Sequence, residues 1–374
     1  MAAARRLPLL AAGAASLVAG LLAGEARLGW ELPGLALSHL HGPLMVCGFF
    51  GTVISLERAA ALKSWWGWLA PPLCAAGGLG LILGAEAVGA ALLVFGSLVF
   101  LSMAVAVLRR QAEPFTLVMA AGAAAWVAGN AAWFHGTAVS QVVPLWASFL
   151  VLTIAGERLE LSRFLKPWRW RAPLLAPPLA LVVVGAALAA LEVPLAWTVF
   201  GAGLMMLVGW SLVNDVARRT IRQTGLTRYV AVCLLSGYGW LWVAGMLAPQ
   251  LDAGLAGPVY DATLHALFVG FVFSMVFGHG PIIVPAVIGA RVAYGPAFYL
   301  PLVVLHGSLA ARLAGDLAGI EALRAAGGLA NAAAIMMFMA TMVTAVALGS
   351  RQSSGKVSRT VVPAAFSNST LPPS

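Results

Sequence analysis

Twelve apolar stretches, each long enough to cross a lipid bilayer, follow one another along the chain. A membrane-spanning helix needs about 20 consecutive, mostly apolar residues. Only 9% of the 374 residues are charged and 61% are hydrophobic, so most of the surface must face lipid rather than water. We therefore predict an all-α polytopic membrane protein whose twelve transmembrane helices lie at residues 7–24, 35–56, 66–84, 87–108, 114–133, 138–156, 173–191, 194–213, 228–248, 258–279, 296–314 and 327–349.

The breaks between these stretches carry Gly, Pro or charged residues, and none is long enough to form a soluble domain. Residues 1–350 are therefore expected to form a single transmembrane domain. Residues 351–374 are rich in Ser and Pro, a composition that favours a disordered cytoplasmic tail.

Basic residues divide unevenly between the two ends of the predicted helices. With the N-terminus inside, all 22 Lys and Arg residues except Arg27, Arg312 and Arg324 fall on the inner side. The positive-inside rule assigns such a side to the cytoplasm. We therefore expect a multi-pass protein of the bacterial inner membrane with both termini in the cytoplasm. Because the net charge of +9 is located at helix ends, it does not indicate a nucleic-acid partner.

A short polar pattern recurs in three of the predicted helices. In helix 2 it runs from His41 to Glu57, and in helix 6 from Gln141 to Glu157. Helix 10 carries His265 at the matching depth. The pattern predicts three arcs formed by helices 1–4, 5–8 and 9–12, with chance similarity of short segments as the alternative.

Glu57 and Glu157 lie at the C-terminal ends of their helices, where the helix dipole disfavours a negative charge. We expect them to pair with Arg58, Arg158 or an arginine of another helix.

His41 and His265 lie at the same depth on different helices. His41 is about six residues, roughly 9 Å, from the outer end of helix 2, and His265 is about seven residues into helix 10. An ionisable residue inside a membrane indicates a functional site. Two imidazoles at one depth could bind one iron from opposite sides, as the axial ligands of a b-type haem do. The alternative is that each histidine bonds a neighbouring carbonyl and only stiffens helix packing.

Two further histidines are candidate metal ligands. His39 points about 200° away from His41 around the helix, so it faces a second site, a loop or another cofactor. His279 lies roughly 21 Å beyond His265 along helix 10. It precedes Pro281 and Pro285, which predict a break in the helix and a possible second site near the inner surface.

The outer-side arginines Arg27, Arg312 and Arg324 could form charge-assisted pairs with haem propionates. The alternative is ion pairing with nearby carboxylates, namely Glu25, Asp316 or Glu321.

Together, the helix count, the helix 2 and helix 10 histidines, and the basic residues near helices 11 and 12 resemble the catalytic subunit of haem-copper oxidases and nitric oxide reductases. This resemblance implies that His41 and His265 hold a low-spin haem and that Arg312 or Arg324 contacts its propionates. The copper histidines of that superfamily have no counterpart, because helices 6, 7 and 8 contain no histidine. The position of its high-spin haem ligand is occupied by Thr263.

The motifs are more similar to the NnrS family of haem- and copper-containing membrane proteins, which is linked to nitric oxide stress. Helix 2 shares a His-x-His with a following Met and Gly-Phe, here His39-Leu-His41, Met45 and Gly48-Phe49. Helix 10 reads similarly from His265 to His279. A Glu that follows the second helix 2 histidine in NnrS proteins is replaced by Gly42.

The resemblance implies haem b, and copper as a further possibility, with a role in electron transfer or nitric oxide response. Whether the chain is an enzyme stays open, because the oxidase copper ligands are missing. The expected partners are the lipid bilayer and a quinol, a cytochrome or other membrane subunits. The alternatives are a membrane subunit of a respiratory complex and a small-solute transporter without a cofactor.

Overall fold

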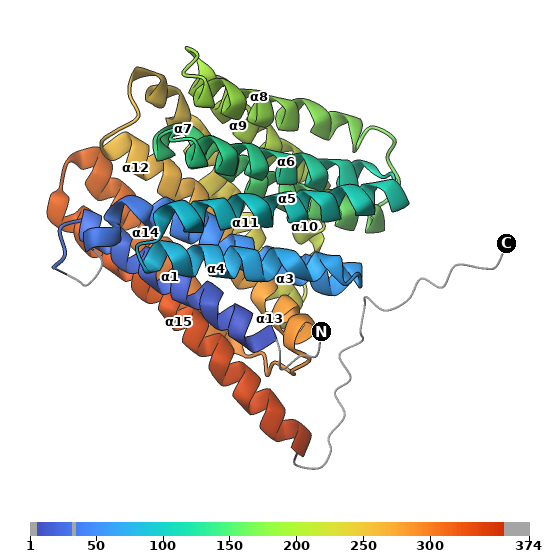
Figure 1. Cartoon of the computed structure of the whole chain (residues 1–374). Helices are drawn as coiled ribbons and strands as arrows, with labels where there is room; N and C mark the ends of the chain where they lie inside the picture. The colour runs from blue at the N-terminus through green and yellow to red at the C-terminus, as the bar shows by residue number, and fades with distance from the viewer. Residues whose placement is uncertain (1–5, 32–34, 355–374) are drawn as a thin grey trace.

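The computed structural model describes residues 6–31 and 35–354, and within them the regular structure is entirely helical (Figure 1). The prediction of an all-α polytopic membrane protein is confirmed. The first half of the bundle consists of α1 (Leu7–Arg27), η2 (Leu35–Leu40), α2 (His41–Pro43), η3 (Leu44–Phe50), α3 (Gly51–Leu62), η4 (Trp66–Leu69), α4 (Ala70–Ile82), α5 (Glu86–Arg110), α6 (Pro114–Phe134), α7 (Val139–Leu161) and η5 (Ser162–Phe164).

The second half of the bundle includes one short helix, α10, on a connection. Its elements are η6 (Pro173–Leu175), α8 (Ala176–Ala190), α9 (Ala196–Asn214), α10 (Ala217–Thr220), α11 (Gly225–Leu247), η7 (Ala248–Ala253), α12 (Pro258–His265), η8 (Ala266–Phe273), α13 (Ser274–Ile288), η9 (Pro296–Phe298), α14 (Tyr299–Ala318) and α15 (Glu321–Ser354).

Each of the twelve predicted stretches forms a helix. Among the described residues, eleven helical segments are long and apolar enough to cross a membrane, and Trp66–Ile82 is a shorter apolar helix between two of them. The main differences are at the ends. The last helix runs to Ser354, beyond the predicted end at residue 349, while residues 355–374 of the predicted tail lie outside the described residues.

The predicted break after His279 is wrong. Helix α13 continues from Ser274 to Ile288 through Pro281 and Pro285. A proline removes one backbone hydrogen bond, but packing against neighbouring helices can stabilise a membrane helix that contains it. Here Phe277 stacks on Phe338 of α15, with the ring centroids 4.0 Å apart.

Three membrane-spanning segments form the centre of the bundle. The segment Val139–Phe164 is 78% buried within its most apolar window, and Ala36–Leu62 and Pro258–Ile288 are each 61% buried, against 56% or less for the others. These segments also contact one another, α2 with α7, α7 with η8 and α3 with α13. They correspond to the second helices of the three predicted four-helix units. At the periphery, α15 contacts α1.

Two of the central segments contain π-helices. The segment η3 begins three residues after His41, and η8 begins directly after His265. π-Helical turns are rare and occur frequently at functional sites. Each of the two histidines therefore lies within three residues of the start of a π-helix.

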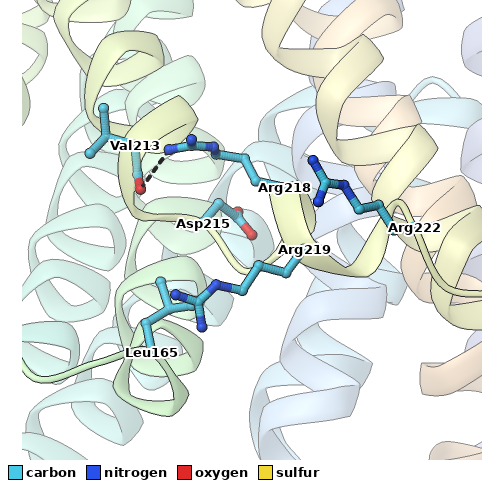
Figure 2. A pocket seen from close by; sticks show the side chains of 6 residues that line it. All are labelled: Leu165, Val213, Asp215, Arg218, Arg219 and Arg222. Atoms are coloured by element: carbon cyan, nitrogen blue, oxygen red, sulfur yellow. Dashed lines mark hydrogen bonds between the residues drawn. The ribbon is translucent and has the colours of Figure 1, made fainter.

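The bundle has two chemically different ends. We call the end that carries Arg58, Arg110, Arg158 and Arg219 the basic end, and the opposite end, which carries His41 and His265, the histidine end. At the basic end, a pocket of about 370 Å³ opens between α9, α10 and the segment after η5 (Figure 2).

Candidate functional site

The structure brings His41 and His265 together at the histidine end. Their ring centroids are 6.3 Å apart and their ring planes are inclined by 21°. His41 is the first residue of α2 and His265 is the last residue of α12. The expectation that the two side chains share one depth is confirmed.

Both rings are held through the same nitrogen. Nδ1 of His41 lies 2.7 Å from the carbonyl oxygen of Gly20 on α1. Nδ1 of His265 lies 2.8 Å from the carbonyl oxygen of Asp261, one turn earlier on its own helix. A carbonyl can only accept a hydrogen bond, so Nδ1 carries the proton in each neutral ring and Nε2 keeps its lone pair. In the described part of the chain, neither Nε2 atom has a hydrogen-bond partner.

This arrangement fits two imidazole ligands on a single metal ion. At a metal–nitrogen bond length of about 2.0–2.1 Å, two rings that bind one ion from opposite sides through Nε2 have centroids about 6 Å apart. The observed separation is 6.3 Å. Metal-bound histidines usually donate their other N–H to a carbonyl or carboxylate, which is the bond that Gly20 and Asp261 accept here.

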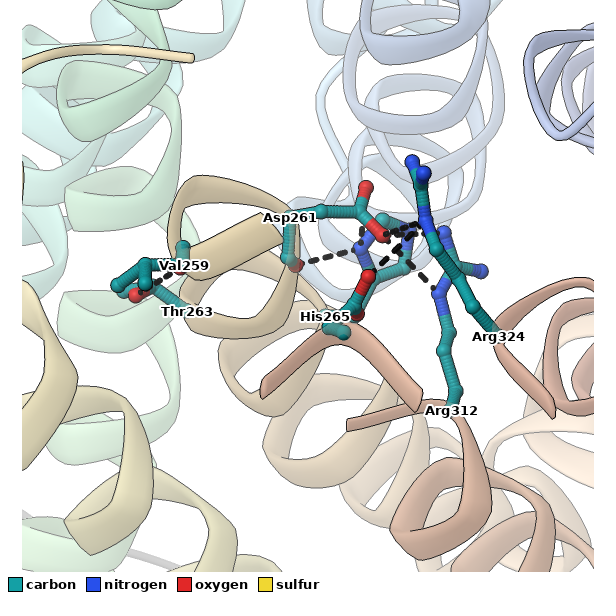
Figure 3. Close-up of polar contacts among 7 residues, drawn as sticks. Val259, Asp261, Thr263, His265, Arg312 and Arg324 are labelled. Carbon is teal, nitrogen blue, oxygen red and sulfur yellow. Dashed lines mark hydrogen bonds and ion pairs between the residues drawn. The ribbon is translucent and has the colours of Figure 1, made fainter. Parts of the chain in front are cut away.

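A network of charged side chains lies next to His265 (Figure 3). Arg312 of α14 donates from Nε and Nη2 to Oδ2 of Asp261, at 3.2 and 2.9 Å. Nε of Arg324 lies 2.9 Å from Oδ1 of Asp316 and 3.8 Å from Oδ2 of Asp261. Oδ1 of Asp261 is 3.3 Å from Nδ1 of His265. The two arginines are therefore beside the histidine pair and already paired with carboxylates.

Arg324 has one of the partners expected for it, Asp316, whereas Asp261 as the partner of Arg312 was missed. Asp261 lies in the first turn of α12, where an acidic residue is common because it complements the helix dipole and so does not by itself indicate an ion pair. Its position one helical turn before His265 was the sequence feature that could have placed Asp261 beside the histidine. Glu25 was considered only as a possible arginine partner. It is 6% exposed and lies near Arg312, and its Oε2 has no hydrogen-bond partner in the described structure.

His39 lies apart from the pair. Its Nε2 is 3.0 Å from Oε1 of Glu86 on α5, and both side chains are more than half exposed. The difference in direction from His41 that the helical geometry predicted is therefore observed. Thr263 also points elsewhere, since its hydroxyl donates to the carbonyl of Val259 (Figure 3).

His279 belongs to a second polar cluster, at the basic end. Its Nδ1 lies 2.6 Å from the carbonyl oxygen of Met275, and its Nε2 lies 2.8 Å from Nη2 of Arg158. Both ring nitrogens therefore have protein partners. In the same region, Nη2 of Arg58 on α3 is 2.5 Å from Oε1 of Glu157 on α7. The expected pairing of Glu157 with an arginine of another helix is confirmed.

Within the described ranges, no group of three or more His, Cys, Asp or Glu side chains is arranged to hold a metal ion. A haem with two axial histidines does not need such a group. A copper site on His39 or His279 stays a prediction, since the structure brings neither residue to the His41–His265 pair.

A family model described as "Domain of unknown function (DUF8744)" matches residues 6–347. The match covers every membrane-spanning helix up to the C-terminal part of α15. No curated protein matches the chain.

Proposed function

The chain belongs to this DUF8744 family, and from the geometry of its site we propose that it binds a b-type haem through His41 and His265. The observation that carries the proposal is the geometry of the pair. The rings are 6.3 Å apart, each is held at Nδ1 by a backbone carbonyl, and each keeps Nε2 for a ligand.

When bound, the haem would supply one-electron redox chemistry at a potential set by its two imidazole ligands and its burial. The carbonyls of Gly20 and Asp261 orient the two imidazoles and increase their basicity as ligands. Arg312 and Arg324 are the basic side chains that would pair with the haem propionates, in exchange for part of their contact with Asp261 and Asp316.

The proposed role is electron transfer or nitric oxide response of the NnrS type, with a quinol, a cytochrome or another membrane subunit as the partner. Because the basic end carries most of the Lys and Arg residues, we place it at the cytoplasmic face of a bacterial inner membrane. The histidine pair then lies near the outer face.

The proposal is tested by the visible spectrum of the full chain purified from cells that are supplied with haem. We expect a Soret band and, after reduction, the sharp alpha band of a low-spin haem with two histidine ligands. A protein that purifies folded but colourless would contradict the proposal.

Variants then assign the ligands. His41→Ala and His265→Ala should each abolish the low-spin spectrum, because either change removes one axial ligand. His135→Ala is the matched control, since His135 is exposed at the end of α6 and should leave the spectrum unchanged. An unchanged spectrum in either ligand variant would overturn the assignment.

A further inference from the structure

The pocket at the basic end is lined by three arginines. It is formed by the end of α9, by α10 and the turn that follows it, and by the residue after η5 (Figure 2). Its lining residues are Leu165, Val213, Asp215, Arg218, Arg219 and Arg222.

The single acidic residue of the pocket is already engaged. Oδ1 of Asp215 accepts a hydrogen bond from the backbone N–H of Ala217 at 2.8 Å, and Oδ2 accepts one from the hydroxyl of Tyr238. Asp215 is also buried, at 4% exposure. Among the residues that the structure describes, Asp215 forms no ion pair with the arginines around it.

The arginines keep most of their donors. Arg218 donates to the carbonyl oxygen of Val213 at 3.3 Å. In the part of the chain that the structure describes, neither Arg219 nor Arg222 forms an ion pair, and all three arginines are exposed. The pocket is thus a concave surface with excess positive charge and free guanidinium donors.

The position of the pocket favours a ligand from the membrane surface. Leu165 begins the segment that also carries Trp168 and Trp170, which are 43% and 49% exposed. Tryptophan concentrates at the boundary between hydrocarbon and water. Basic pockets between transmembrane helices bind phosphate-bearing lipid headgroups.

We propose that this pocket binds a phosphate group, and that its natural source is the headgroup of an anionic phospholipid. Guanidinium groups form paired, charge-assisted hydrogen bonds with phosphate oxygens, and three arginines can surround one phosphate. Free inorganic phosphate shares this chemistry and is the other possible source. The proposal is independent of the haem site, which lies at the opposite end of the bundle.

The experiment uses the full chain in a neutral detergent, titrated in parallel with phosphatidylglycerol, phosphatidylcholine and inorganic phosphate. The readout is the unfolding midpoint, followed with a thiol-reactive dye, since Cys47, Cys74 and Cys233 are all buried and free. Binding to the folded state raises this midpoint. The variant is R219Q/R222Q, and the matched control is R109Q/R110Q, an exposed arginine pair at the same end, on α5, outside this pocket.

We expect phosphatidylglycerol to raise the midpoint of the wild type and of R109Q/R110Q, with phosphatidylcholine having little effect. R219Q/R222Q should need about tenfold more lipid for the same shift, the loss expected when charge-assisted hydrogen bonds to the ligand are removed. If inorganic phosphate alone gives the same variant-dependent shift, a phosphate site is supported but its lipid source is wrong. If R219Q/R222Q responds as the wild type does to both ligands, the site is overturned.

A second measurement needs only the wild type. The preference for phosphatidylglycerol over phosphatidylcholine should fall as NaCl rises, because exposed charges are screened. A preference that is independent of salt would overturn the proposal even if the double variant could not be purified.

Discussion

The imidazole of His41 is positioned by two glycines of the neighbouring helix α1. The carbonyl of Gly20 accepts its N–H bond. Gly24 leaves the space that the ring occupies, because a Cβ atom at that position would lie 2.8 Å from both Nδ1 and Cε1 of His41. The direction of the candidate ligand therefore depends on a residue that has no polar side chain of its own.

This dependence gives a test at Gly24. Gly24→Ala should displace the ring of His41 and so weaken or abolish the low-spin haem spectrum, while alanine favours the helix itself. Gly209→Ala in α9 is the control, since nothing lies within 4 Å of its added Cβ, and it should keep the spectrum. Equal spectra in the two variants would show that His41 does not need this packing to bind haem.

Asp261 holds the buried guanidinium of Arg312, whose side chain is only 7% exposed. Asp261→Asn removes the charge and leaves Arg312 without its anion. Breaking a buried ion pair in this way costs about 3–5 kcal/mol, so the unfolding midpoint should fall clearly. Glu86→Gln is the control, because its pair with His39 is more than half exposed on both sides and should contribute about 0–1 kcal/mol. If Asp261→Asn lowers the unfolding midpoint no more than Glu86→Gln does, the ion pair between Asp261 and Arg312 does not stabilise the fold as proposed.

The sequence allowed the depth of His41 and His265 to be predicted, because depth follows from counting residues along a helix. It did not allow the partner of Arg312 to be predicted. That contact depends on how α12 and α14 pack, and the carboxylates expected as partners were Glu25, Asp316 and Glu321, whereas Arg312 pairs with Asp261.

At the scale of the elements, two polar contacts at the basic end join the three central segments. One contact links the first segment to the second, and the other links the second to the third. Arg58 of α3 pairs with Glu157 of α7, and Arg158 of α7 lies against His279 of α13. These contacts therefore connect the second helices of the three predicted four-helix units at this end of the bundle.

The pair between α3 and α7 can be tested by exchanging its charges. Its side chains are 28% and 25% exposed, so Glu157→Gln should cost more than the ~0–1 kcal/mol of a surface pair and less than the ~3–5 kcal/mol of a buried one. Arg58→Glu combined with Glu157→Arg should recover part of the loss in the unfolding midpoint that Arg58→Glu alone causes. Glu160→Gln, which alters a more exposed pair with Arg163 on one helix, is the control. If the exchanged pair is no more stable than the Arg58→Glu single variant, the contact does not connect the two helices.

The π-helices η3 and η8 and the continuous helix through Pro281 could not be predicted at this scale. In a segment that is apolar on every side, the hydrophobic pattern carries little information about backbone turns. The conformation near a proline is also decided by the neighbouring helices.

For the molecule as a whole, the twelve stretches were predictable because a membrane leaves a helix as the only way for one apolar segment to satisfy its own backbone. The precise ends were not, since helices α7 and α15 continue past the apolar region into the polar ends. The distribution of Lys and Arg residues also predicts the orientation of the bundle in the membrane, which the positions of the helices alone do not predict.

That orientation can be tested with one exposed position at each end of α6. The native cysteines are buried, so a single introduced thiol can be labelled selectively in intact cells with a membrane-impermeant maleimide. Gln111 is exposed just after α5 at the basic end, and Ala138 is exposed before α7 at the histidine end. Because the basic end is placed in the cytoplasm, Ala138→Cys should react in intact cells and Gln111→Cys only after permeabilisation. The native chain is the unlabelled control. The reverse pattern would place the histidine pair at the cytoplasmic face and would contradict the proposed orientation.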